Sequence, residues 1–104
     1  MECTSLAAVR QQIDRIDQQL VSLLAERGGY VCQAARFKTD AAAVAAPQRV
    51  AAVLARVDAL ASELGADRQV VAAVWRAMID AFIVAEQAAH AALHPPTPTP
   101  LTSD

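Results

Sequence analysis

The stretch SLAAVRQQIDRIDQQLVSLLAER, residues 5–27, decides the fold class of this chain. Its apolar residues recur every three or four positions, which is the spacing of one face of an α-helix. Ser5, or Thr4 before it, can cap the helix by accepting a backbone hydrogen bond. We predict one helix over residues 5–38, with a break at Gly28-Gly29 as the alternative, because glycine disfavours helix. Its apolar stripe contains Leu6, Val9, Ile13, Ile16, Leu20, Leu24, Val31 and Ala34.

Residues that favour the ends of helices predict two further helices. Pro47 suits the first turn of a helix and Gly65 suits a C-terminal cap, which predicts a helix between them. Asp67 can cap a third helix that runs to about Leu93. Residues typical of strands are rare, so the predicted fold class is all-α. We expect residues 1–94 to form a helical domain with a loop at 39–46, and the Pro/Thr-rich residues 95–104 to be a disordered tail.

The lengths of these helices predict a homodimer. At 1.5 Å per residue the first helix is roughly 50 Å long, the second roughly 27 Å and the third roughly 39 Å. Two shorter helices cannot cover an apolar stripe that runs the whole length of the first. Part of that stripe must therefore meet another subunit, and we expect the long helices of two copies to pair or exchange.

Composition excludes several classes of function. The net charge of -2 gives no electrostatic reason to expect nucleic acid or membrane as a partner. Charged residues interrupt every apolar segment, and no secretory signal is visible, so we expect a cytoplasmic protein. Cys3 and Cys32 form no CxxC motif, and His90 and His94 lack a third ligand. We therefore expect no metal and no cofactor.

Three cations in the predicted first helix occupy unusual positions. Arg27 lies three residues after Leu24, on the apolar stripe, and Lys38 lies eleven residues further on. Eleven helical steps return to within about 20° of the same face, roughly 16 Å along the axis. Arg10 lies about 100° round the helix and roughly 25 Å from Arg27, so it can join such a site only from a partner subunit. We interpret these cations as the binding group for a small dicarboxylate, although a single Lys or Arg is more often simply solvated.

Glu86 is a carboxyl group on the apolar face of the third helix. It continues the spacing of Trp75, Ile79 and Phe82 at intervals of four, three and four residues. A buried charge without a partner is costly. Glu86 must therefore pair with a cation, carry a proton, or lie at the rim of the apolar face.

The segments RQQIDRID (residues 10–17), LLAER (23–27), FK (37–38) and PQR (47–49) resemble the all-helical chorismate mutases and the related isochorismate-pyruvate lyases. The resemblance covers about residues 3–90. It implies an intertwined homodimer of three-helix chains, with an active site that receives one arginine from the partner. The matching residues are Arg10 for that arginine, Arg27 for the second arginine, Arg49 for the arginine of the second helix, and Lys38 and Glu86 beside the ether oxygen of the substrate.

The chemistry of this family explains the residue types. Chorismate carries two carboxylates, which arginine binds well. Its rearrangement to prephenate, a step of aromatic amino acid biosynthesis, needs a compact substrate conformer and hydrogen-bond donors at the ether oxygen. Lys38 and a protonated Glu86 can be those donors. The reaction needs no nucleophile, metal or cofactor.

Two departures from the family pattern bear on the activity. Glu86 stands where glutamine is common, so it must stay protonated to donate, and activity should fall as the pH rises through its titration. Ala46 and Val50 stand where many chorismate mutases have acidic residues, which resembles the lyase subgroup. We favour chorismate mutase from the sequence, with isochorismate-pyruvate lyase as the alternative. A dimeric helical adaptor without an active site is the alternative of another class.

Overall fold

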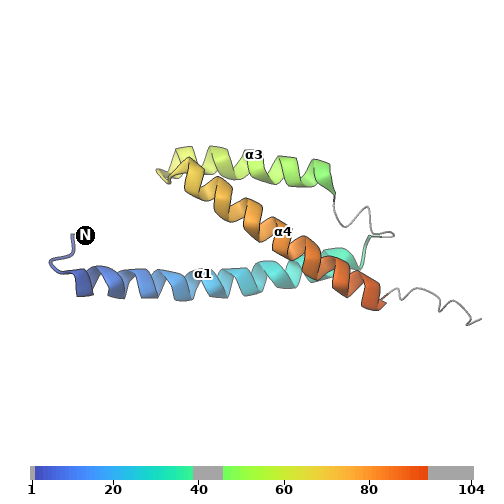
Figure 1. The fold of residues 1–104 in the computed structure, drawn as a ribbon, viewed down its shortest axis with the longest axis horizontal. Coiled ribbons are helices and arrows are strands. Elements are labelled where there is room, and N and C mark those ends of the chain that lie inside the picture. The colour runs from blue at the N-terminus through green and yellow to red at the C-terminus, as the bar shows by residue number, and fades with distance from the viewer. Residues whose placement is uncertain (1, 39–45, 94–104) are drawn as a thin grey trace, which may run out of the picture. The chain divides into compact units, whose positions relative to one another are not determined.

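The computed structural model describes residues 2–38 and 46–93, which contain three α-helices and no strand (Figure 1). Helix α1 spans Leu6–Ala35, α3 spans Pro47–Leu64 and α4 spans Arg68–Leu93. The predicted all-α fold of three helices is confirmed. The predicted tail, and the predicted loop apart from its last residue, lie outside the described residues. Contacts within the chain divide it into two compact units, Met1–Val31 and Cys32–Asp104.

Helix α1 begins where its capping residue predicts. The hydroxyl of Ser5 accepts a hydrogen bond from the backbone N–H of Ala8 at 3.1 Å, and the Ser5 carbonyl accepts one from Val9 at 3.1 Å. Gly28 and Gly29 both lie inside the helix, so the alternative of a break there is wrong.

The end of α1 differs from the prediction. The N–H groups of Arg36, Phe37 and Lys38 donate to carbonyls three residues earlier, at 3.1, 3.0 and 3.4 Å. Such bonds tighten the last turn and end the α-helix, here at Ala35. Lys38 therefore lies beyond the helix, so the predicted continuation of the helix to residue 38 is wrong and helical spacing does not place Lys38.

The first unit consists mostly of α1 and buries little of its apolar stripe. Six stripe residues between positions 6 and 24 are between 39% and 62% exposed in the single chain. Ala35, the one buried residue of α1, belongs to the second unit. Isolated helices gain most of their stability from packing of an apolar face, so α1 needs a covering surface. The six residues are Leu6, Val9, Ile13, Ile16, Leu20 and Leu24.

The second unit contains a hairpin of α3 and α4. Pro47 occupies the first turn of α3, and Gly65 follows its last residue with a φ of 75°, a left-handed conformation that favours glycine. The Asp67 carboxylate then caps α4 by accepting hydrogen bonds from the N–H groups of Gln69 and Val70 at 2.9 and 3.1 Å. The predicted ends of both helices are confirmed.

The two helices of the hairpin pack against each other around a small core. They meet at the Gly65 turn and separate toward the start of α3 and the end of α4 (Figure 1). Val57 and Ala61 of α3 and Ile79 of α4 are buried. None of the described helices combines the length and the apolar character that a membrane span requires.

An ion pair joins the helices close to their turn. The guanidinium of Arg68 donates to both carboxylate oxygens of Asp58, at 2.8 and 2.7 Å. This hydrogen bonding, together with the positive charge of Arg68, lowers the pKa of Asp58 below its usual value of 3.8, and partial desolvation opposes the shift. Both side chains are well exposed, at 63% and 42%, so the contribution to stability is small.

We predict that the ionised carboxylate of Asp58 stabilises the hairpin and that this stabilisation is lost at low pH. A carboxylate whose pKa is lowered by folding stabilises the protein above its usual pKa and loses that effect as the pH falls through the lowered value. Asp58→Asn should therefore unfold at a lower temperature than the wild type at pH 7, and the difference should shrink toward pH 3 and below. Arg68→Gln is the matched control and should lower the unfolding temperature at pH 7 to a similar extent. A difference between wild type and Asp58→Asn that does not change with pH would contradict the assignment.

Candidate active site

Lys38 and Glu86 form the polar centre of the second unit. The Lys38 ammonium (Nζ) donates a hydrogen bond to Oε1 of Glu86 at 2.6 Å. The Glu86 side chain is 6% exposed and that of Lys38 is 25% exposed, so the pair is largely shielded from water. Ionised hydrogen bonds of this kind are short and strong. The structure thus brings together two of the five residues that the sequence predicts for the site.

Each member of the pair is positioned by its own element. Lys38 follows the tightened turn that ends α1, so its position depends on the three hydrogen bonds of that turn. Glu86 lies on the buried face of α4, seven residues after the buried Ile79, while its neighbour Gln87 is exposed. The predicted position of Glu86 on the apolar face is therefore confirmed, and its partner is Lys38.

The pair still has hydrogen-bonding capacity for a ligand. An ammonium group has three N–H donors, and the contact with Glu86 uses one of them. A carboxylate only accepts hydrogen bonds, so Glu86 can donate to a ligand only after it takes up a proton. The arrangement can hold an anionic or ether oxygen beside a cation in a partly buried place.

The remaining predicted cations are more exposed. Arg10 is exposed and Arg27 is half-buried, both on α1 in the first unit. Seventeen residues of unbroken helix separate them, which corresponds to about 25 Å along the axis. Arg49 is exposed on the first turn of α3. No ion pair or hydrogen bond is described between Arg49 and either member of the Lys38–Glu86 pair.

His90 is a polar residue of this region whose position the sequence analysis did not predict. It is buried and lies four residues after Glu86 on α4. The signal that could have identified it is the continued spacing of Phe82, Glu86 and His90 at intervals of four residues. The described residues contain no group of three His, Cys, Asp or Glu side chains that could hold a metal ion, and His94 lies outside them.

The described chain is all-helical, with a largely shielded Lys38–Glu86 pair and with Arg10 and Arg27 on its long first helix. The family model of chorismate mutase type II matches residues 9–87, and the chain belongs to that family. The chain is also 44% identical over 86 residues to the isochorismate pyruvate lyase of Pseudomonas aeruginosa, covering 83% of this chain and 84% of that protein. The matched region contains all five predicted site residues.

Proposed function

We propose that this protein catalyses the loss of pyruvate from isochorismate to give salicylate, and that it also rearranges chorismate to prephenate. The observation that carries this proposal is the Lys38–Glu86 pair, in which a cation and a carboxyl group lie side by side in a partly buried place. From the sequence alone we favour the mutase reaction. The 44% identity to an isochorismate pyruvate lyase now favours the lyase reaction, as do the apolar Ala46 and Val50.

The proposed roles of the arginines follow from the charge of the substrate. Both substrates carry two carboxylates, and a guanidinium group can bind a carboxylate through two parallel hydrogen bonds. Arg27 and Arg49 hold the substrate from one chain, and Arg10 adds a third guanidinium from the partner subunit. Together these cations fix the ring and the enolpyruvyl group in the compact conformer from which the reaction proceeds.

The proposed homodimer supplies that third arginine and covers the apolar stripe of α1. The six large apolar residues of the α1 stripe are at least 39% exposed in one chain, and a contiguous exposed apolar surface of this kind often marks an interface. Arg10 lies on the same part of α1 as this stripe, about 25 Å from Arg27. A second copy that covers the stripe therefore receives Arg10 at its own site.

Lys38 and Glu86 act in the proposed reaction on the ether oxygen of the substrate. The bond between this oxygen and the ring breaks in both reactions, and negative charge grows on the oxygen. The Lys38 ammonium and a protonated Glu86 donate to it and stabilise that charge. In the lyase reaction a ring hydrogen also moves to the departing enolpyruvyl group, so that pyruvate leaves and the ring becomes aromatic.

Parallel assays with isochorismate and chorismate test the proposed function. We expect salicylate and pyruvate from the first substrate, prephenate from the second, and a higher kcat/KM for isochorismate. Arg27→Ala should lower kcat/KM for both by at least about 100-fold, because it removes a charged contact to a carboxylate. The exposed Arg56→Ala is the matched control and should keep wild-type activity. A wild-type protein that converts neither substrate would support the adaptor alternative and contradict the proposal.

The proposed role of Glu86 predicts a pH dependence. Its carboxylate accepts from Lys38 in the free protein and must take up a proton before it can donate to the substrate. The value of kcat/KM should therefore fall as the pH rises, because the proton that Glu86 must take up becomes scarcer. Glu86→Gln, which always donates, should remove this decline.

His90 of α4 is also buried, so the pH experiment needs a control that tests its contribution to the decline of kcat/KM. It lies one helical turn beyond Glu86 and is also an ionisable group. His90→Asn should keep the alkaline decline of kcat/KM if Glu86 is responsible for it. A Glu86→Gln variant with the wild-type pH profile would contradict the role of Glu86.

A further inference from the structure

Ala46 has a backbone conformation that alanine rarely adopts. Its φ of 35° and ψ of 65° lie in the left-handed region, where the side chain of an L-residue crowds the following carbonyl oxygen. Among the residues that the structure describes, it is the one non-glycine residue with a positive φ. A residue before proline is also pushed toward extended conformations, and Pro47 follows directly. Such a conformation costs free energy and persists only where the surrounding structure holds it.

The start of α3 depends on the backbone of Ala46. No side chain caps this helix, whereas residues that cap a helix with a side-chain oxygen usually have an extended backbone. The carbonyl of Ala46 accepts the first hydrogen bond of the helix, from the N–H of Val50 at 3.0 Å. The ring of Pro47 fixes its own φ near the helical value. The φ and ψ of Ala46 therefore set the direction in which α3 begins.

Arg49 lies on this first turn, three residues after Ala46. Its side chain is exposed, and within the described part of the chain it takes part in no hydrogen bond or ion pair. The position of Arg49 is therefore set by the backbone at the start of α3 and not by a contact of its own side chain.

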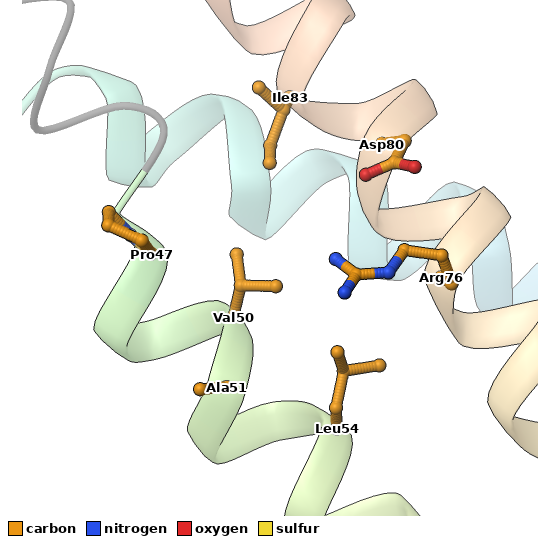
Figure 2. Close-up of a pocket in the computed structure, with 7 residues that line it drawn as sticks. All are labelled: Pro47, Val50, Ala51, Leu54, Arg76, Asp80 and Ile83. Carbon is orange, nitrogen blue, oxygen red and sulfur yellow. The ribbon is translucent and has the colours of Figure 1, made fainter.

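A cleft of about 370 Å³ between α3 and α4 begins at the same turn (Figure 2). Its α3 side includes Pro47 and Val50, which flank Gln48 and Arg49 in the sequence. The charged residues at its border are Arg76 and Asp80 of α4. A different direction of the first turn would therefore change the shape of this cleft as well as the position of Arg49.

We propose that Ala46 is a positioning residue for Arg49. This inference rests on the proposed function, in which Arg49 binds a carboxylate of the substrate. Two parallel hydrogen bonds from a guanidinium to a carboxylate require a defined orientation of both groups. The left-handed backbone at Ala46 directs the first turn of α3 so that Arg49 starts from this orientation before the substrate binds. A relaxed, extended backbone at position 46 would turn the start of α3 away from it.

Substitutions that differ in their tolerance of a positive φ test this inference. Ala46→Val should raise KM for isochorismate and chorismate by at least about fivefold, because β-branched residues disfavour the left-handed conformation. The value of kcat should change little, since a carboxylate contact contributes to the bound substrate and the transition state alike. Ala46→Gly, which adopts a positive φ without strain, should keep KM within about twofold of the wild type.

Two further variants serve as controls for the size of the side chain. Ala52→Val adds the same two methyl groups at an exposed position of α3 and should keep the wild-type KM. Ala46→Leu is bulky without a branched β-carbon, so its KM should lie between those of Ala46→Gly and Ala46→Val. Circular dichroism checks that each variant has the helix content of the wild type at the temperature of the assay.

Combined substitutions test whether Ala46 acts through Arg49. Arg49→Ala alone should raise KM by at least about tenfold. In the Arg49→Ala background, Ala46→Val should raise KM no further, so the two effects should not add. An equal effect of Ala46→Val in both backgrounds, or a wild-type KM for Ala46→Val, would overturn this inference and leave the proposed function intact. A wild-type KM for Arg49→Ala, or no turnover of either substrate, would overturn the proposed role of Arg49 and this inference together.

Discussion

The hydrogen bond between the ammonium of Lys38 and the carboxylate of Glu86 connects parts of the chain that are 48 residues apart. It joins the turn that ends α1 to the buried face of α4. Because Glu86 is almost fully buried, its charge needs the ammonium of Lys38 nearby. The turn after Ala35 fixes the start of the Lys38 side chain, and the hairpin of α3 and α4 fixes Glu86. The proposed chemistry uses the same two groups, so the contact that stabilises the substrate-free protein is also the one that a substrate must reorganise.

The second constraint on the protein is the exposed apolar stripe of α1. A helix of thirty residues with half-exposed leucine and isoleucine side chains is not a stable end state for a single chain. In the proposed dimer the same long helix carries the apolar surface that needs covering and Arg10, the residue that the partner's site needs. Assembly and substrate binding would then depend on each other, since a separated chain would have Arg27, Lys38 and Glu86 but no cation in the position of Arg10.

The helix boundaries show which parts of this fold can be predicted from sequence. The ends marked by a local signal were predicted correctly, because Ser5, Pro47, Gly65 and Asp67 each act on the backbone within a few residues. The end of α1 has no such residue, and its apolar periodicity continues to Ala34, so the prediction extended the helix three residues too far. Lys38 lies beyond the last residue of α1, so helical spacing does not place it.

Contacts between distant residues are the part that the sequence predicts least. The spacing of residues on α4 predicts that Glu86 lies on the buried face. Spacing alone does not show whether Glu86 pairs with a cation, carries a proton or reaches solvent. Arg76 and Asp80 lie on α4 at a spacing that is usual for solvated charges. Only the geometry of the α3–α4 hairpin shows that they border a cleft with apolar walls.

In the proposed dimer two chains build each active site, and complementation between two inactive variants is a direct test of this arrangement. Arg10→Ala lacks the cation given to the partner, and Lys38→Ala lacks the donor of its own site. After unfolding and refolding of an equal mixture, half of the dimers should contain one chain of each kind, and each of these has one intact site. We expect about a quarter of the wild-type activity from the mixture, against almost none from either variant alone. A mixture no more active than its components would contradict the shared site.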